Sequence, residues 1–265
     1  MKFTKMHGCA NDYIYIDCTA KQPENIPQLA VSLSDRHTGI GGDGIVLICK
    51  SDIADFKMRM FNADGSEGAM CGNAIRCVGK YVYDRKLTAK TRLNIETLSG
   101  VKRLDLSVSD GKVESVTVNM GKPVIRGKGE TEPISGVRYS YTDISMGNPH
   151  CVIFIKDVLN FDVAGVGRRI ENMTHLFPDR TNVEFAEIID SRTLRMRVWE
   201  RGSGETMACG TGACACVAAA IEQGKCQAGT PVTVLLNGGS LEITLKSEIF
   251  MTGPAEFVFD GEIEI

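Results

Sequence analysis

Short apolar runs separated by turn residues dominate the chain, and they follow one another in the way that β-strands do. Such runs cover 101–108, 113–118, 151–155, 194–199, 232–236 and 241–245, and turn signals separate them. Helical periodicity is rarer and is clearest over 27–36, 72–85 and 210–223. The pattern predicts an α+β protein in which strands outnumber helices.

The same order of parts occurs twice, with an offset of 138 residues, the separation of Cys71 and Cys209. In both copies a strand leads through a turn rich in glycine and serine into a helix that follows the cysteine. The coinciding pairs are Arg59 with Arg197, Glu67 with Glu205, Cys71 with Cys209, and Gly72 with Gly210. The repeat predicts two similar domains, 1–117 and 118–251, with a final strand over 252–265 that returns to the first.

Cys71 and Cys209 therefore occupy equivalent positions, each directly before a predicted helix. Unsatisfied amides and the macrodipole at a helix N-terminus favour an anion. A stabilisation of roughly 1 to 2 kcal/mol would lower the pKa of a thiol from about 8.5 by about one unit. One such cysteine is more often a buried structural residue. Two at equivalent positions favour a pair of thiols that act as acid and base near neutral pH.

Inversion of a stereocentre by proton transfer requires a base on one face of the carbon and an acid on the other. A duplicated domain supplies such a pair, and the amides after each cysteine can bind an α-carboxylate. Several polar residues beside predicted strands are candidates for binding the ammonium and carboxylate groups of an amino acid, although surface loops explain such residues more often. They are Asn11, Asn62, His150, Asn182, Glu200 and Arg201.

Composition narrows the class of protein further. The 265 residues are 43% hydrophobic and 24% charged, values ordinary for a globular protein, and the net charge of −3 gives no general attraction to nucleic acid or anionic lipid. The N-terminus has no apolar signal region, and no segment is apolar enough to span a membrane, so a cytoplasmic location is expected. The ten cysteines are then expected to be thiols. Since Cys-x-x-Cys does not occur, no zinc or other metal site is predicted.

The residues from Asn11 through both cysteine segments to Thr211 resemble the diaminopimelate epimerase family, over essentially the whole chain. The segments Met-Cys-Gly-Asn-Ala-Ile-Arg (70–76) and Ala-Cys-Gly-Thr-Gly-Ala (208–213) carry the resemblance. It implies two β-barrel-like domains, each wrapped around a central helix, with the active site between them and no cofactor. The implied reaction interconverts LL- and meso-2,6-diaminoheptanedioate, a step toward lysine and peptidoglycan.

The resemblance also implies roles for individual residues. Cys71 corresponds to the proton donor and Cys209 to the proton acceptor in the LL-to-meso direction, while His150 and Glu200 tune the thiols. Some relatives carry a glutamine where this chain has Gly44, so a side-chain contact is missing there. The implied substrate contacts are Asn11, Asn62, Gly72, Asn73, Asn148, Asn182, Glu200, Arg201, Gly210 and Thr211.

Other functions remain open at this point. A proline or hydroxyproline racemase shares the two-cysteine plan, but it needs a pocket for one small ring, whereas this chain offers polar groups for a second amino-acid end. Outside enzymes, a binding protein for amino acids or a redox-sensing dithiol would explain the two cysteines. The expected partner is a small amino-acid substrate, with a homodimer possible and neither nucleic acid nor membrane involved.

Overall fold

The computed structural model describes residues 1–264, and the chain divides into two compact units. The first unit comprises residues 1–118 and the segment that begins at Gly253, and the second comprises residues 119–252. No helix within the described residues is long and apolar enough to cross a membrane.

The first unit contains the helices α1 (Ile26–Ser34) and α2 (Gly72–Asp84). Its strands are β1 (Lys2–Gly8), β2 (Asn11–Cys18), β3 (Gly44–Cys49), β4 (Phe56–Asn62), β5 (Glu67–Gly68), β6 (Arg92–Thr97), β7 (Gly100–Ser109), β8 (Lys112–Gly121) and β18 (Glu256–Glu262). Hydrogen-bonded neighbours follow the order β18, β1, β2, β3, β4, β6, β7 and β8, with β5 on β4. The β2–β3 and β4–β6 pairs are parallel, and the other pairs are antiparallel.

The second unit contains the helices α3 (Val163–Glu171) and α4 (Gly210–Glu222). Its strands are β9 (Val124–Glu130), β10 (Ser140–Ser145), β11 (Pro149–Phe154), β12 (Asn182–Asp190), β13 (Thr193–Glu200), β14 (Gly204–Thr206), β15 (Val232–Leu236), β16 (Gly239–Leu245) and β17 (Ile249–Gly253). Their order is β9, β10, β11, β12, β13, β15, β16 and β17, with β14 on β13. The parallel pairs β11–β12 and β13–β15 take the same places as in the first unit.

The two sheets thus repeat one order of strands and one sequence of pair directions. The position of β9 in the second unit is filled in the first by β18, which pairs with β1 from Lys2 opposite Glu262 to His7 opposite Glu256. The last strand of the chain therefore completes the sheet of the first unit.

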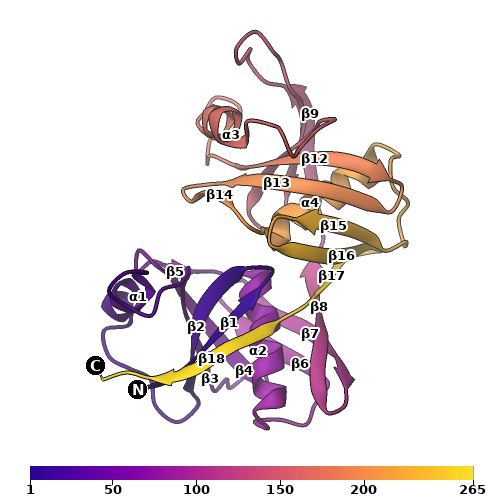
Figure 1. The fold of residues 1–265 in the computed structure, drawn as a ribbon. Helices are drawn as coiled ribbons and strands as arrows, with labels where there is room; N and C mark the ends of the chain where they lie inside the picture. Colours follow the sequence, from indigo (N-terminus) through magenta and orange to yellow (C-terminus); the bar gives the residue numbers. More distant parts are fainter. Residues whose placement is uncertain (265) are drawn as a thin grey trace. The chain divides into compact units, whose positions relative to one another are not determined.

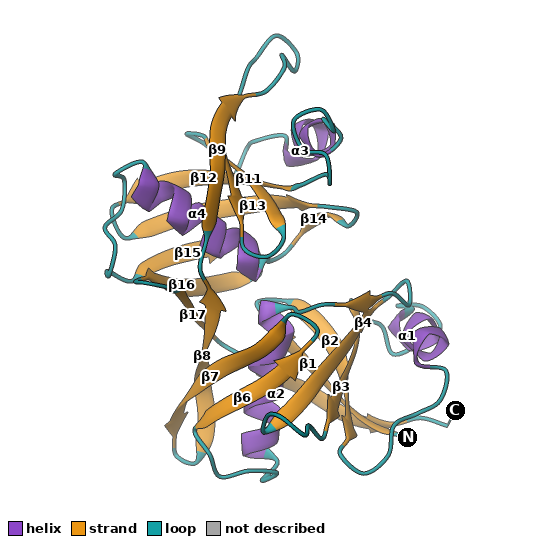
Figure 2. Ribbon diagram, turned by 180° about the vertical axis from the view of Figure 1, so that it is seen from behind, coloured by secondary structure: helices purple, strands orange, loops and turns teal. Residues whose placement is uncertain are grey.

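Each sheet encloses a central helix, as Figures 1 and 2 show. Every residue of α2 except Tyr83 is buried, and α4 is buried from Gly212 to Ala220. A helix buried on all sides needs apolar or small residues around its whole circumference, and the run Ala-Cys-Ala-Cys-Val-Ala-Ala-Ala (213–220) supplies them. The predicted fold class, two similar sheet-rich units around central helices, is confirmed.

The helices α1 and α3 occupy equivalent places on the other face of each sheet. Leu29 and Leu33 of α1 belong to a cluster with strand residues of β2, β3 and β4, and α3 contacts β12, β13 and β14. The sequence pattern did not predict α3, because two glycines interrupt it. Its signals are Asp162, which caps the helix by accepting from the amide of Gly165 at 2.8 Å, and apolar residues three and four positions apart.

Arg76 is a fully buried side chain of α2 that joins three segments of the first unit. Its guanidinium donates to the carbonyl of Pro254 at 3.1 Å, to the carbonyl of Gly72 at 3.0 Å and to the sulfur of Cys9 at 3.6 Å. A guanidinium suits these three contacts because it is planar and carries several donors, whereas an ammonium group has a different geometry. The residue connects the helix with the segment that leads into β18.

We predict that Arg76→Met lowers the free energy of unfolding by about 2 to 4 kcal/mol, since buried carbonyl acceptors lose a charged donor. Arg92→Met is the matched control. The Arg92 side chain is 71% exposed and pairs with Asp105 at 2.9 Å, so its loss should cost less than about 0.5 kcal/mol. Urea denaturation followed by circular dichroism measures both, and equal losses would contradict the assignment.

Candidate active site

Cys71 is the residue at which helix α2 begins. Its backbone is extended (φ −126°, ψ 123°), and its sulfur accepts a hydrogen bond from the amide of Ala74 at 3.5 Å. A thiol therefore takes the place of serine or aspartate, which are the usual N-cap acceptors. The residue is half-buried, and its sulfur lies where the helix amides favour negative charge.

Asn11 faces Cys71 from the first position of β2. Its side-chain oxygen accepts from the Cys71 thiol at 3.3 Å and from the side-chain amide of Asn73 at 3.4 Å. The two-residue turn before it consists of Cys9 and Ala10, whose φ angles are 54° and 62°. Left-handed backbone costs a residue other than glycine roughly 1 kcal/mol, and here it places Asn11 directly beside the helix start.

Cys209 begins helix α4 by the same device. Its backbone is extended (φ −121°, ψ 111°), and its sulfur accepts from the amide of Gly212 at 3.3 Å. The hydroxyl of Thr211 lies 3.5 Å from the same sulfur. The predicted helix starts after both cysteines are therefore confirmed, and each unit presents a thiol with amides of the following residues around it.

A chain of hydrogen bonds leads from a buried carboxylate to Cys209. His150 is fully buried, with Nδ1 2.6 Å from Oε1 of Glu184 and Nε2 3.1 Å from the side-chain oxygen of Asn148. The nitrogen of the same Asn148 amide donates to the hydroxyl of Thr211 at 3.3 Å. Because this hydroxyl accepts from Asn148, its own proton is available to the sulfur of Cys209.

Burial raises the pKa of the Cys209 thiol well above its ordinary value, and the carboxylates of Glu200 and Glu184 raise it further. The Thr211 hydroxyl and the Gly212 amide act in the opposite sense by donating to the sulfur. The pKa of Cys209 is therefore raised, and not lowered as its position at a helix start alone predicts, because burial outweighs the helix amides. A nearby positive charge would favour its ionisation.

Asn182 connects the end of β13 with the start of β11. Its side-chain nitrogen donates to the carbonyl of Pro149 at 2.9 Å, and its oxygen accepts from the backbone amide of Arg201 at 2.9 Å. The Arg201 guanidinium is exposed and donates to the carbonyl of Asp179 at 2.8 Å. The segment that carries Glu200 and Arg201 is thus fixed by Asn182.

The remaining predicted contact in the first unit is Asn62, at the end of β4. Asn62 pairs with Gly44 across the β3–β4 ladder, and its amide donates to the hydroxyl of Ser66 at 3.0 Å. A β-carbon at position 44 would lie 2.0 Å from the carbonyl oxygen of Phe61. This backbone therefore leaves no room for any side chain at Gly44, which explains in steric terms why glutamine is absent there.

The repeated residues that precede the cysteines form the same ion pair in both units. Arg59 and Glu67 lie 2.7 Å apart between β4 and β5, and Arg197 and Glu205 lie 2.8 Å apart between β13 and β14. Each pair joins the strand to the short hairpin that leads into the cysteine. The repeated arginine and glutamate therefore have a structural role, because each pair holds the segment that positions Cys71 or Cys209.

The structure gathers the predicted site residues into one group in each unit, with the exception of Asn62, whose amide bonds Ser66 and not a member of the first group. Two carboxylates that the sequence pattern did not single out lie next to these groups, Glu184 beside His150 and Asp43 beside Asn11. Glu184 has a recognisable signal, a charged residue between the apolar residues Val183 and Phe185, whereas Asp43 lies in a glycine-rich turn and has none. The group in the first unit is Asn11, Cys71, Gly72 and Asn73, and that in the second is Asn148, His150, Asn182, Glu200, Arg201, Cys209, Gly210 and Thr211.

Comparison of the sequence with known proteins gives matches over the full length of the chain. The model of the family described as "Diaminopimelate epimerase" matches residues 3–126 and 142–258. Diaminopimelate epimerase of Methanococcus maripaludis strain C5 is 51% identical over 282 residues, with all of both chains covered. The protein of the same name from Bacteroides thetaiotaomicron is 53% identical over 271 residues, covering all of this chain and 98% of its own.

Solved structures of lower sequence identity share the fold. A hydroxyproline epimerase from Agrobacterium vitis, solved with bound trans-4-hydroxy-L-proline, superposes with a TM-score of 0.76 at 14% identity and covers 98% of this chain and 91% of its own. A protein of the PhzF family of phenazine biosynthesis from Bacillus anthracis gives a TM-score of 0.74 at 16% identity, covering 100% and 99%. At these identities the likeness concerns the fold alone.

We predict that Glu184→Gln moves the alkylation of Cys209 to lower pH. The carboxylate raises the pKa of this thiol, so its replacement by a neutral amide lowers that pKa, and the thiolate persists further into the acid range. Iodoacetamide labelling as a function of pH, read from the Cys209 peptide by mass spectrometry, measures the effect.

Glu187→Gln is the control for this variant, because Glu187 lies on the same strand but pairs with Arg195 at 3.8 Å. In this control the pH dependence of Cys209 labelling should match that of the unsubstituted protein. A Glu184→Gln profile that coincides with that of the unsubstituted protein would show that the carboxylate does not act on the thiol.

Proposed function

The chain belongs to the diaminopimelate epimerase family, and from this premise we propose that it interconverts LL- and meso-2,6-diaminoheptanedioate by exchanging the proton on one α-carbon. The product serves lysine and peptidoglycan synthesis. The observation that carries the proposal is the pair of thiols, each at the start of a central helix and each accepting the amide hydrogen three residues on.

In the LL-to-meso direction the Cys209 thiolate takes the proton from the α-carbon, and the Cys71 thiol delivers another to the opposite face. Cys209 is left as a thiol and Cys71 as a thiolate, so the reverse reaction starts from this state with the roles exchanged. The acidity of both thiols must lie near the working pH for such transfers to be efficient. No step consumes a second reactant, which is consistent with an isomerase.

The amides of Gly72 and Asn73 and those of Gly210 and Thr211 are suited to hold the α-carboxylate. Helix N-termini stabilise anions, and the same amides stabilise the charge that develops on the carboxylate when the α-proton leaves. The α-ammonium group of the substrate adds a positive charge near Cys209. That charge opposes the effect of burial and of the neighbouring carboxylates on the thiol, and it promotes the thiolate when substrate is bound.

Asn62, Asn182, Glu200 and Arg201 are proposed to recognise the second amino-acid end of the substrate. Arg201 is suited to its carboxylate, because a guanidinium binds carboxylates with two parallel hydrogen bonds. A racemase for proline would need no such groups. Proline and hydroxyproline should therefore be poor substrates.

Incubation of the purified protein with LL-2,6-diaminoheptanedioate in heavy water tests the proposal. Deuterium should appear at the α-carbon of the meso product, because the proton that Cys71 delivers exchanges with solvent. The same incubation with L-proline and with trans-4-hydroxy-L-proline is the comparison. Deuteration of these ring compounds at a higher rate would reassign the substrate, and no deuteration in any incubation would indicate a binding protein.

Each thiol is required in both directions of the reaction. We predict that Cys71→Ala and Cys209→Ala each lower kcat by at least about 10²-fold in both directions, the lower range for removing a positioned acid or base. The double variant should be little worse than either single one, since the pair acts as a unit. A single variant that keeps more than a tenth of the activity would exclude its cysteine from the acid and base roles.

A cytoplasmic location and a homodimeric assembly complete the proposal. Thiol-based acid and base catalysis needs a compartment that keeps cysteines reduced. Sedimentation equilibrium over a range of protein concentrations measures the assembly state.

A further inference from the structure

We propose that Asp43 is a positioning residue that fixes the side-chain amide of Asn11 with its oxygen, and not its nitrogen, toward Cys71. The amide thereby favours the protonated form of Cys71, the form that an acid requires. The inference rests on the proposed function for its meaning, since it assigns a cause to the donor role of Cys71. Its geometry and its test stand apart from the reaction.

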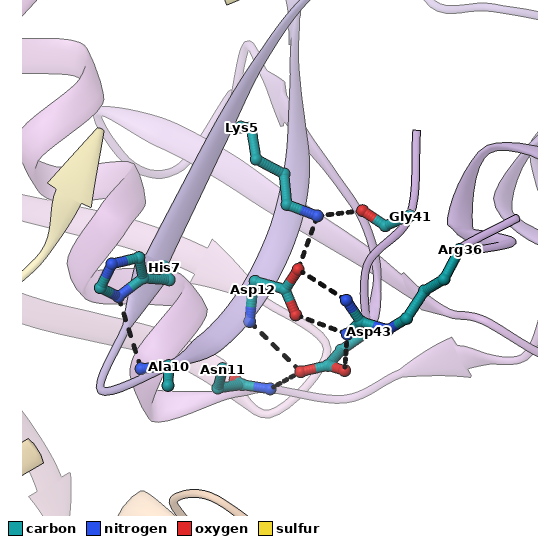
Figure 3. A network of polar contacts seen from close by, with 8 residues as sticks. All are labelled: Lys5, His7, Ala10, Asn11, Asp12, Arg36, Gly41 and Asp43. Carbon is teal, nitrogen blue, oxygen red and sulfur yellow. Dashed lines mark hydrogen bonds and ion pairs between the residues drawn. The ribbon is translucent and has the colours of Figure 1, made fainter. Parts of the chain in front are cut away.

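Asp43 lies in the turn before β3 and is held there by its backbone. Its amide donates to the carbonyl of Asp12 at 2.7 Å, and its carbonyl accepts from the amide of Ala63 at 3.1 Å. The carboxylate oxygen Oδ2 accepts from Nδ2 of Asn11 at 2.7 Å and from the backbone amide of Asp12 at 3.2 Å, and Oδ1 accepts from Arg36 at 3.0 Å (Figure 3).

A second carboxylate and two cations complete this network. Asp12 pairs with Lys5 at 2.6 Å and with Arg36 at 2.8 Å, and the buried Lys5 also donates to the carbonyl of Gly41. Burial tends to raise the pKa of Asp12, but hydrogen bonds and charges from Arg36 and Lys5 outweigh it and lower the pKa. The carboxylate of Asp43 is thus held in a cluster whose charges balance.

An ionised carboxylate only accepts hydrogen bonds, so the group of Asn11 that faces Asp43 must be the NH₂ group. The oxygen of the same amide then points to Cys71, 3.3 Å from its sulfur, with Asn73 donating to it from 3.4 Å. The bond to Asp43 is the shortest of the three and is charge-assisted. The Asn11 oxygen in this position accepts a hydrogen bond from the Cys71 thiol, whereas it repels the negatively charged thiolate.

The second unit shows the opposite arrangement at the equivalent asparagine. Asn148 precedes β11 as Asn11 opens β2, but its oxygen faces His150 and its nitrogen faces Thr211. The hydroxyl of Thr211 can then donate to Cys209. One half-site therefore presents an acceptor to its sulfur and the other a donor, which corresponds to the acid and the base of the proposed reaction.

Two other titratable groups pack near Cys71 from β2 and α2, and both stay neutral in the range of a labelling experiment. Burial raises the pKa of Tyr15 well above its ordinary value, and burial raises the pKa of Cys77 to about 12. The charged groups near Asp43 are Arg36, Asp12 and Lys5. The rate at which Cys71 reacts between pH 6 and 9 therefore reports on its own proton.

The test is the rate of iodoacetamide labelling of Cys71 at pH 7, read from its peptide by mass spectrometry, because only the thiolate reacts. In Asp43→Ala the amide of Asn11 loses its carboxylate partner and can turn its nitrogen to the sulfur, so labelling should become about three- to tenfold faster, the ratio that one hydrogen bond supplies. Asp55→Ala is the control, because it removes a carboxylate of the same unit that bonds Lys90 and the amide of Asn94 and not Asn11. Its labelling rate should stay within about twofold of the unsubstituted protein.

Coupling with Asn11→Ala shows whether Asp43 acts through Asn11. Removal of the amide should itself speed the labelling of Cys71, and adding Asp43→Ala to that variant should change nothing more. The proposal would be overturned if Asp43→Ala accelerated labelling equally with and without Asn11→Ala, or if Asp55→Ala accelerated it as much as Asp43→Ala.

Circular dichroism confirms that each variant is folded. If Asp43→Ala is not, Asp43→Ser replaces it, since its hydroxyl is too short to reach the Asn11 amide. Labelling without acceleration in the folded variant overturns the proposal. The experiment contains no substrate, so its failure is separable from failure of the proposed reaction.

Discussion

A helix that begins inside a sheet exposes amides that neither solvent nor its own backbone can satisfy, and both units of this protein are built around that constraint. Helix α2 is enclosed almost completely, and its first amides need an acceptor from the chain itself. Cysteine sulfur supplies it at Cys71 and again at Cys209. The atom that completes the helix therefore also lies where the helix dipole favours a negative charge. The fold and the chemistry of each unit thus depend on the same contact, the hydrogen bond from a helix amide to a cysteine sulfur.

The enclosing sheets explain why the polar residues gather at those helix ends. In each sheet the two parallel pairs place the starts of neighbouring strands side by side, as Ile14 beside Ile45 and His150 beside Asn182. Residues at the start of β2 and in the turn before β3 consequently meet beside Cys71, although more than thirty residues separate Asn11 from Asp43. The same pairing brings β11 and β12 together beside Cys209.

The sequence predicted the parts that depend on local pattern and missed those that depend on pairing. The helices begin at Gly72 and Gly210 as expected, because a turn rich in glycine and a capping side chain mark each start. Asp43 could not be assigned, since its neighbour Asn11 is fixed only by the parallel β2–β3 pair. Helix α3 was missed for a local reason, the glycines within it. The fold class followed from the repeat together with the family resemblance.

Duplication yields two like half-sites, but a proton must enter on one side and leave on the other. The difference between the units does not lie in the caps, which are alike to within 0.2 Å in their sulfur–amide distances of 3.5 and 3.3 Å. The difference lies in the residues around the caps. Val46 faces Met60 in the first sheet where Glu184 faces Val198 in the second, so a carboxylate takes the place of an aliphatic side chain below Cys209. In the first unit the carboxylate belongs to Asp43, and the side chain of Asn11 lies between this carboxylate and Cys71. The two units therefore share the helix cap and differ in the charged residues around it.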